Sequence, residues 1–587
     1  MPPALTSRGS GRLRPDGPLA LALVLGLGLL VLAPAAQTPF LLDDYMHASM
    51  VDGTAGLRRG PLDLYDFVND ADRPAMLDRG LLPWWAHPRL TIRFFRPLSS
   101  ALRYLELARL RGPGAVLAMH ALSLLWWALA VLAVHALFRR HLPPRAAILG
   151  TAIFGLGPWH VLPIGWLANR EVLLSIAIGV PALLAHRRFR DEGRRAYGLL
   201  AGLGFLLAFG CGEYAFCAGA YVLADELLRR GAPLWRRALG TLPFALPALA
   251  YLVVRRLAGY GTFGSAFYAD PLSEPLKLLS VAPRRLLVLL AEGWLTLGTD
   301  AWGTEASRET IAALVLLAGV PIALTLRALL RACEEPERTA AARLLLGSLL
   351  ALLPVLPAVP APRVLGWSAI GMAGGIALLL DRAWFPAVPP PRRGAGELTF
   401  ACATLLGFLH LVHGPLAGAL AGEGLRASSA YYQATSSALA QRLAARGRGE
   451  VHVLRGAAGA FFGPFAFAGA GAPAARWRVL SQTAHALALR IDDRTLELVA
   501  PAAQGLYPEG AGNLFRDPMH PLLAGDVVRM AGMTVEVLQA NAHGPTRARF
   551  TFARPLETTP NAWIDERFDG LREAELPAVG FGAPYDP

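Results

Sequence analysis

The sequence contains few charged residues, one lysine and four cysteines among its 587 positions. Charged residues make up only 17% of the chain and hydrophobic residues 54%, a composition too apolar for a soluble enzyme. The cysteines lie in or beside apolar runs without Cys-x-x-Cys or His-Cys spacing, so neither a disulfide framework nor a zinc site is indicated. The composition predicts an α-helical, polytopic membrane protein.

The net charge of +13 would suggest a nucleic-acid partner in a soluble domain. Here the arginines collect in short segments between apolar runs, which is the pattern of membrane topology. Lys277 is the only lysine, and the abundance of arginine is a bias of the whole chain. No nucleic-acid partner is predicted, and the position of each arginine matters more than its number.

Membrane-spanning helices need roughly 17 to 25 mainly apolar residues. Eleven runs approach this length, and they predict a multi-span membrane domain over residues 1–420. The runs are 18–36, 115–138, 146–162, 171–185, 197–212, 214–228, 239–254, 309–326, 344–359, 364–380 and 398–420.

Arginine-bearing segments fall on one side of these runs, and the positive-inside rule makes that side cytoplasmic. The opposite side then carries a large first outer loop, 37–114, a second outer loop, 255–308, and everything after residue 420. A span at 284–297 would break this alternation, so this run is interpreted as a helix at the outer interface. Twelve spans with a different C-terminal side are the alternative.

The composition changes after the last apolar run. Residues 421–449 have the pattern of an amphipathic helical linker. Over 450–587, short β-prone segments such as 451–454 and 495–499 alternate with Gly, Pro, Asn and Asp-Asp turns. This pattern predicts a periplasmic β-rich domain, a small β-sandwich.

Two adjacent carboxylates, Asp43 and Asp44, follow the first apolar run. Ionisable groups near hydrocarbon are costly, by about 2.5 to 3.5 kcal/mol at the bilayer centre on insertion scales, so their presence indicates a function. In the alternative interpretation they only end a signal anchor in water. A cleavable signal peptide is disfavoured, although Arg8, Arg12 and Arg14 precede the run, because the run is long for one.

Further ionisable residues lie at the outer ends of the predicted spans. Arginine binds phosphate or diphosphate through its planar fork of donors. A carboxylate pair serves as general base or metal ligand. Together these groups suit an anionic, lipid-linked donor attacked by an acceptor hydroxyl. Besides Asp43 and Asp44, the set comprises Arg96, Arg170, Glu171, Glu213, Arg255, Arg256 and Arg363.

Each of these residues also has a structural interpretation. Arg96, which precedes a proline, would orient a loop helix, and Arg170 and Glu171 would pair with each other at a span end. Arg255-Arg256 and Arg363 would only reach lipid headgroups.

Four features of the layout stand together. They are a first span followed by Asp-Asp, a long outer loop with Pro83-Trp84-Trp85 and Phe95-Arg96-Pro97-Leu98, the turn Asn169-Arg170-Glu171 and the turn Gly212-Glu213. They resemble the GT-C superfamily of membrane glycosyltransferases, such as the protein O-mannosyltransferases and the lipid A aminoarabinose transferase. The resemblance covers about residues 15–420 and lies in layout more than in residue identity.

The resemblance implies a polyprenyl-phosphate sugar donor, transfer on the periplasmic side and an essential acid in the first outer loop. That acid falls on Asp43 or Asp44, with a slight preference for Asp44 as the base that deprotonates the acceptor. Glu213 matches the acid of a Lys-Glu pair in related enzymes, but Gly212 stands where the lysine would be, which leaves the role of Glu213 open. Arg96, Arg170 and Arg363 take phosphate-binding or loop-anchoring positions.

The leading hypothesis is an inverting glycosyltransferase of a bacterial-type inner membrane, with a lipid, glycan or protein acceptor. No cofactor is required, and assistance by a divalent metal (Mg or Mn) stays open; His410 and His413 lack a third ligand for a metal site. One alternative is a transporter or flippase for lipid-linked glycans, which would place charges mid-span and show inverted repeats. A membrane scaffold that presents the β-rich domain is the other.

Overall fold

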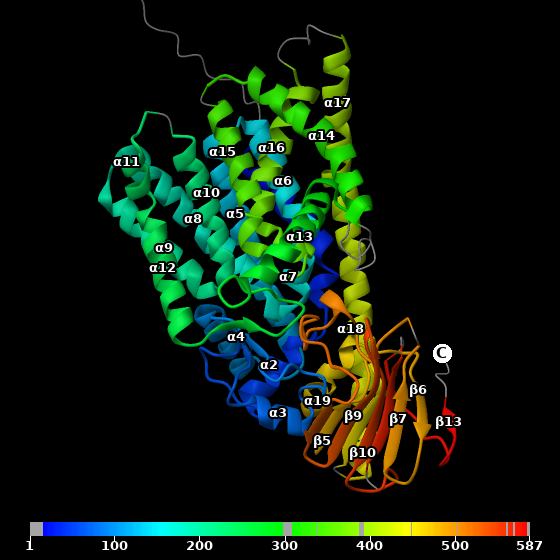
Figure 1. Cartoon of the computed structure of the whole chain (residues 1–587). Helices are drawn as coiled ribbons and strands as arrows, with labels where there is room; N and C mark the ends of the chain where they lie inside the picture. Colours follow the sequence, from blue (N-terminus) through cyan, green and yellow to red (C-terminus); the bar gives the residue numbers. More distant parts are fainter. Residues whose placement is uncertain are drawn as a thin grey trace, which may run out of the picture.

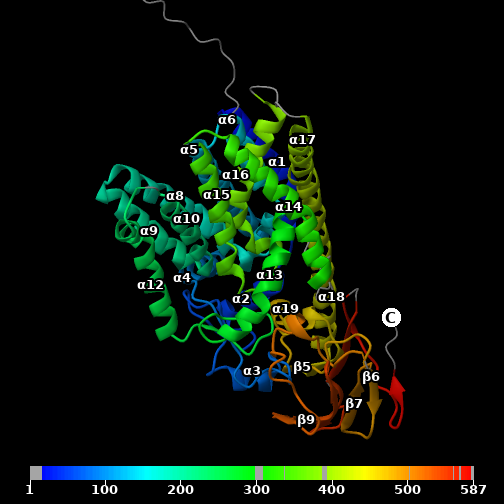
Figure 2. The ribbon, with the colours of Figure 1, turned by 45° about the horizontal axis from the view of Figure 1, so that its top comes forward.

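A bundle of helices fills most of the molecule, and a β-rich region lies at one end of it (Figures 1 and 2). The computed structural model describes residues 16–229, 231–297, 308–335, 337–386, 393–447, 449–501, 503–558, 561–567 and 570–583. The predicted basic start of the chain (Arg8, Arg12, Arg14) and part of the second outer loop (298–307) lie outside the described residues.

The long helices follow the apolar runs of the sequence. In α16 every residue from Gly366 to Asp381 is buried, so this helix forms the centre of the bundle. It packs closely on α15, because Gly371 leaves no side chain between its backbone and the carbonyl of Leu344. The helices of the bundle are α1 (Pro18–Leu32), α5 (Ala115–His141), α6 (Pro144–Leu156), α7 (Val161–Gly165), α8 (Glu171–Glu192), α9 (Arg195–Cys211), α10 (Phe216–Leu227), α11 (Leu234–Gly240), α12 (Leu242–Leu257), α13 (Pro275–Leu295), α14 (Arg308–Ala332), α15 (Glu337–Leu350), α16 (Gly366–Trp384), α17 (Arg393–Phe408) and α18 (Gly414–Ala445).

Among the described residues, four helical segments are long and apolar enough to cross a membrane: Ala115–His141, Leu167–Glu192, Glu337–Val355 and Gly396–Ala445. The number rises to six if each of two bent helix pairs forms one span. These pairs are α6 with Pro158–Gly165, bent by 46°, and α11 with α12, bent by 59°. The α-helical membrane class is thus supported, and the count of eleven spans stays a prediction.

Two helices differ from the sequence-based expectation. The predicted linker 421–449 is no separate element, because α17, a π-helical turn (Leu409–His413) and α18 follow one another without a break. The predicted interfacial run 284–297 belongs to α13, which begins at Pro275 and packs on α14 and α16. Its Leu289 lies in the same hydrophobic core as the long helices, so α13 does not rest apart from the bundle.

The C-terminal region contains two β-sheets, as its alternating pattern predicts. A six-stranded antiparallel sheet has the order β13-β6-β7-β10-β9-β8, and a four-stranded sheet has the order β12-β11-β4-β5. In the smaller sheet β4 runs parallel to β5 and β11, with α19 (Gly463–Gly469) between β4 and β5, so the region is no simple antiparallel sandwich. The strands are β4 (Glu450–Arg455), β5 (Arg476–Val479), β6 (Leu487–Arg490), β7 (Thr495–Val499), β8 (Val527–Met530), β9 (Met533–Asn541), β10 (Gly544–Phe552), β11 (Ala562–Arg567), β12 (Gly570–Glu573) and β13 (Gly582–Ala583).

The first outer loop folds as part of this region. It forms α2 (Asp43–Asp52), α3 (Arg73–Arg79), α4 (Pro97–Arg109) and a small sheet, in which β1 (Asp66–Val68) and β2 (Thr91–Arg93) pair with β3 (Gly261–Phe263) of the second outer loop. Trp84 is buried against Phe550, and its indole nitrogen donates to the carbonyl of Leu480 at 2.9 Å. One hydrophobic core therefore joins the loop to the β-rich region.

The arrangement of elements predicts which positions an impermeant reagent reaches. Leu62 in the first outer loop and Met519 in the β-rich region are exposed, and so is Glu192 at the end of α8. We expect cysteine at Leu62 or Met519 to react with an impermeant maleimide in outer-membrane-permeabilised cells, whereas cysteine at Glu192 should react only after lysis. Equal labelling of all three in intact inner membranes would contradict the predicted orientation.

Candidate active site

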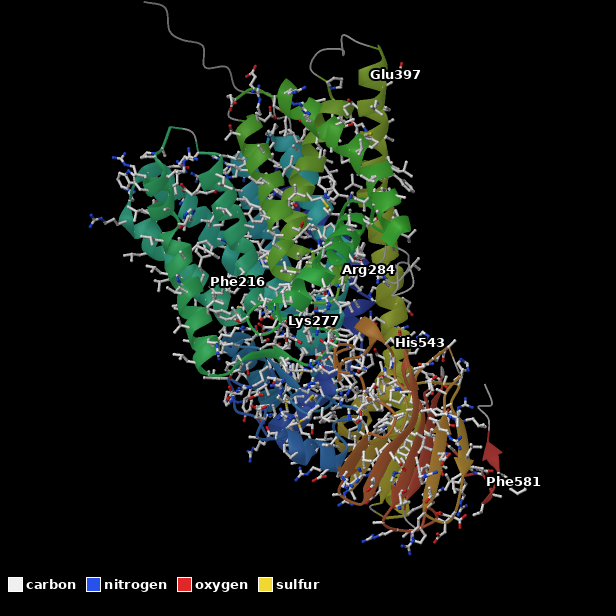
Figure 3. All side chains as sticks on the ribbon, viewed as in Figure 1. Phe216, Lys277, Arg284, Glu397, His543 and Phe581 are labelled. Atoms are coloured by element: carbon white, nitrogen blue, oxygen red, sulfur yellow. The ribbon has the colours of Figure 1, made fainter. Side chains whose placement is uncertain are left out.

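A cavity of about 580 Å³ opens between the ends of the helices and the outer-loop elements. Phe216, which lines it, and Lys277, near its wall, lie in the half of the bundle that faces the β-rich region (Figure 3). We call it the site cavity, because six residues of the predicted set line it together. They are Asp43, Arg96, Glu171, Glu213, Arg255 and Arg363.

Asp43 is the first residue of α2, and its side chain lines the site cavity with partial exposure. Burial, and then the neighbouring Asp44 carboxylate, raise the pKa of Asp43 to about 7, although Arg363 and Arg96 oppose the rise. The preceding residue, Leu42, has φ of 45°, a left-handed conformation that is strained for a leucine. A carboxylate with such a pKa is suited to accept a proton near neutral pH.

Asp44 points away from the cavity and is completely buried. Its carboxylate accepts hydrogen bonds from the backbone amides of Leu41 (3.1 Å) and Ala168 (2.8 Å) and lies 3.4 Å from the guanidinium of Arg103. These contacts tie α2 to α4 and to the turn before α8. The slight preference for Asp44 as the base stays a prediction; its oxygens contact protein groups, and of the two carboxylates Asp43 is the one that lines the cavity.

Arg96 stands between two carboxylates. Its guanidinium binds both oxygens of Glu213 and donates to Glu171 at 2.7 Å. A side chain at Gly212 would meet that of Arg96 at about 3.0 Å, and Gly212 itself has φ of 140°, which favours glycine. Arg96 thus supplies the cation beside Glu213 that the sequence resemblance expected at position 212.

Arg363 differs from the other arginines of the cavity. Arg255 forms an ion pair with the buried carboxylate of Asp270, and Arg96 is paired as described above. In the part of the chain that the structure describes, Arg363 makes no ion pair; it donates to the Tyr214 hydroxyl at 3.3 Å and its guanidinium lies 5.6 Å from the ring of Trp166. Its charge is therefore available to an anionic ligand.

Besides Asp44, two members of the predicted set lie outside the site cavity. Arg170 is buried and does not pair with Glu171; it forms an ion pair with Glu106 and donates to the Ser123 hydroxyl (2.7 Å) and to the carbonyl of Met119 (2.7 Å). Each of its three guanidinium nitrogens thus contacts a protein group, and Arg170 joins the start of α8 to α4 and α5. Arg256 is exposed and does not line the cavity, in agreement with the headgroup interpretation.

Several cavity residues carry no recognisable signal in the sequence. Asp270 lies in an irregular loop, fifteen positions after its partner Arg255. Because the two residues do not belong to one helix or strand, no regular spacing in the sequence indicates that they meet. Tyr65, Tyr214 and Tyr268 bring phenol groups into the cavity. Of the three tyrosines, only Tyr214 could have been associated with the site from the sequence, because it directly follows Glu213 in the predicted turn.

No three His, Cys, Asp or Glu side chains come together as a metal site within the described residues. His410 is bonded to the carbonyl of Trp294 (3.1 Å) and His413 to the hydroxyl of Thr296 (2.8 Å). The two histidines thus connect the π-helical turn to the C-terminal end of α13.

Comparisons with known proteins add structural likeness only. No family model and no curated protein matches the sequence. The apo oligosaccharyltransferase of Archaeoglobus fulgidus matches over 78% of this chain and 64% of its own, with 12% identity and a TM-score of 0.44. ArnT from Cupriavidus metallidurans bound to undecaprenyl phosphate matches over 76% and 84%, with 14% identity and a TM-score of 0.40.

AglB from the same archaeon, in complex with an inhibitory peptide and a dolichol-phosphate, matches over 72% of this chain and 57% of its own, with 14% identity and a TM-score of 0.39. This chain thus spans less than two thirds of the length of the archaeal proteins. An oligosaccharyltransferase and ArnT are thus among the structures that it resembles.

The different surroundings of Asp43 and Asp44 predict opposite effects on stability. Asp44→Asn turns an amide group toward backbone N–H donors and removes one of the two carboxylates that pair with the buried Arg103, the other being Glu106. Hydrogen bonds to charged groups contribute about 1.5 to 3 kcal/mol, so we expect a lower unfolding midpoint in detergent by thermal scanning. A midpoint equal to that of the wild type would contradict the anchoring role of Asp44.

Asp43→Asn should instead relieve an unfavourable burial. Because the folded pKa of Asp43 lies above its unfolded value of 3.8, the folded state holds the proton longer, and wild-type stability falls as pH rises from about 4 to about 7. The variant lacks this loss, so its unfolding midpoint should match the wild type at pH 4 and exceed it at pH 8. A lower midpoint at pH 8 would contradict the desolvated environment of Asp43.

Proposed function

We propose that this protein is a membrane glycosyltransferase that moves a sugar from a polyprenyl-phosphate donor to an acceptor hydroxyl at the periplasmic face. One observation carries the proposal: the site cavity holds a carboxylate with a raised pKa, Asp43, together with Arg363, whose guanidinium forms no ion pair within the described residues. The first group suits proton abstraction and the second suits a departing phosphate.

In the proposed reaction the Asp43 carboxylate removes the proton of the acceptor hydroxyl. The acceptor oxygen then forms a bond to the anomeric carbon of the sugar, on the face opposite the phosphate. The bond between that carbon and the phosphate oxygen breaks, and its electron pair stays on the phosphate, where Arg363 stabilises the added charge. The configuration at the anomeric carbon is inverted.

The remaining charged residues would shape the site. Arg96, held by Glu171 and Glu213, and Arg255, held by Asp270, are already neutralised, so we assign them to the cavity walls. Apolar side chains from α10, α12 and α13 line the same cavity and support the binding of a polyprenyl chain alongside the charged groups. They include Phe216, Phe244, Leu252 and Leu278.

The base is tested by Asp43→Asn, which keeps the size of the side chain but removes its charge. Loss of a general base lowers rates about 10²- to 10⁴-fold. We expect the rate of sugar transfer by the purified variant to fall by this factor. The assay uses radiolabelled polyprenyl-phosphate sugars, with and without added Mg²⁺. For the wild type, kcat/KM should rise with pH and level off above about pH 7, because only the ionised carboxylate accepts the proton.

Asp52→Asn is the matched control, because Asp52 ends the same helix and only pairs with the exposed Arg111. It should retain transfer. Full activity of Asp43→Asn would remove Asp43 from the mechanism, and Glu171 and Glu213 would be the next carboxylates to test.

The phosphate-binding role is tested by Arg363→Ala. The change removes the cavity guanidinium that forms no ion pair among the described residues, so binding of undecaprenyl phosphate, measured by displacement of a fluorescent analogue, should weaken at least about tenfold. Arg363→Lys keeps the charge without the fork of donors and should be intermediate. The exposed Arg256→Ala is the control; equal loss in both alanine variants would indicate a general surface attraction rather than a site.

A further inference from the structure

A second cavity of about 660 Å³ lies on the other side of the first turn of α2. We call it the lateral cavity; first-loop residues, the middle of α18 and the β-rich region together form its walls. Leu42 lines the lateral cavity and Asp43 lines the site cavity. Consecutive Cα atoms are about 3.8 Å apart, so one peptide unit separates the two spaces at the proposed base.

The lining of the lateral cavity is aromatic and carries no positive charge. Phe40 and Tyr45 meet edge to face, as do Tyr45 and Tyr432. Among the described residues that line it there is no Arg, Lys or His, and the charged one is Glu566, which accepts hydrogen bonds from the backbone amides of Ala457 (2.6 Å) and Ala460 (2.8 Å). An anionic group would meet a carboxylate here and no cation, so the lining favours an uncharged ligand.

Two buried hydroxyls of this lining lack a partner. The side chains of Tyr45 and Ser429 are 7% and 3% exposed, and their hydroxyls form no hydrogen bond within the described part of the chain. An unsatisfied buried polar group costs about 1 to 3 kcal/mol. Hydroxyl groups of a ligand in the lateral cavity would satisfy both, which favours a ligand whose polar part bears hydroxyls.

One face of α18 connects the cavity to the membrane-facing surface. Leu416, Leu420, Ala427 and Tyr431 share this face, because separations of 4, 11 and 15 residues lie close to whole turns of 3.6 residues. Leu416 and Leu420 are 59% and 65% exposed within a segment apolar enough to cross a membrane, and Ala427 and Tyr431 line the cavity. In Figures 1 and 2, α18 runs from the bundle to the β-rich region.

We infer that the lateral cavity binds the acceptor of the proposed reaction, and that this acceptor is a membrane lipid with an uncharged, hydroxyl-bearing headgroup. The inference rests on the proposed function. The apolar chains lie along the exposed leucines of α18, and the headgroup enters the aromatic lining. Its hydroxyl reaches Asp43 from the side of Leu42, while the donor occupies the site cavity, which brings nucleophile and leaving group to opposite faces of the anomeric carbon.

The probe is a photoactivatable diacylglycerol that carries one neutral hexose, added to the full-length protein in nanodiscs. We expect crosslinks in the peptides that contain residues 40–45 and 427–432, mapped by mass spectrometry. Ala427→Trp fills the lateral cavity and should lower this labelling at least about tenfold. Gln433→Trp puts the same side chain on another face of α18, where Gln433 is exposed, and should leave the labelling unchanged.

Three outcomes would overturn the acceptor site. These are undiminished labelling in Ala427→Trp, equal competition by an anionic lipid such as phosphatidylglycerol, and competition by a soluble glycan or peptide instead of unlabelled glycolipid. Binding of undecaprenyl phosphate, measured in the same nanodiscs, separates the two proposals. If the wild type binds the glycolipid probe as expected but binds no undecaprenyl phosphate, the lipid site stands and the proposed glycosyl transfer fails.

Discussion

The buried carboxylate of Asp44 is the contact on which the outer end of the molecule depends. It contacts the first turn of α2, the backbone amides before α8 and the guanidinium of Arg103 on α4. The buried charge of the carboxylate is stabilised because each of these groups donates a hydrogen bond to it or carries the opposite charge. With α2 held in this place, Asp43 faces the site cavity and Leu42 faces the lateral cavity. Leu42, the residue between the two cavities, has a positive φ of 45°, which is strained for a leucine.

Charge neutralisation explains how so many ionisable groups share one low-dielectric space. Isolated charges are expensive away from water, and here the guanidinium of Arg96 pairs with Glu171 and Glu213, and that of Arg255 pairs with Asp270. These ion pairs form part of the wall of the site cavity. The chemistry we propose is assigned to the carboxylate of Asp43 and the guanidinium of Arg363, which form no ion pair within the described residues. Titratable groups whose pKa is shifted by burial and by specific charges are common at functional sites.

The β-rich region is a structural component of the site end rather than an appended module. It shares a hydrophobic core with the first outer loop through Trp84, and Lys277, the single lysine, pairs with Asp517 where α13 meets the region. Glu566 of β11 contributes to the lateral cavity directly. A movement of the β-rich region would therefore change both cavities. It would act on the site cavity through α13, which forms part of its wall, and on the lateral cavity through residues of the β-rich region that line it.

The sequence by itself determined the apolar helical class, the β-rich character that begins near residue 450 and the collection of charged residues at one face. These features follow from the local spacing of hydrophobic and charged residues, because apolar side chains avoid water and charged side chains stay in it. The sequence could not separate Asp43 from Asp44, two identical side chains in consecutive positions, since a helix turns by about 100° per residue and only its docking decides which one meets open space. Nor could the sequence show that Arg170 forms an ion pair with Glu106, whereas Arg363 forms no ion pair within the described residues. Those outcomes depend on partners far away in the chain, which only the tertiary structure brings within hydrogen-bonding distance.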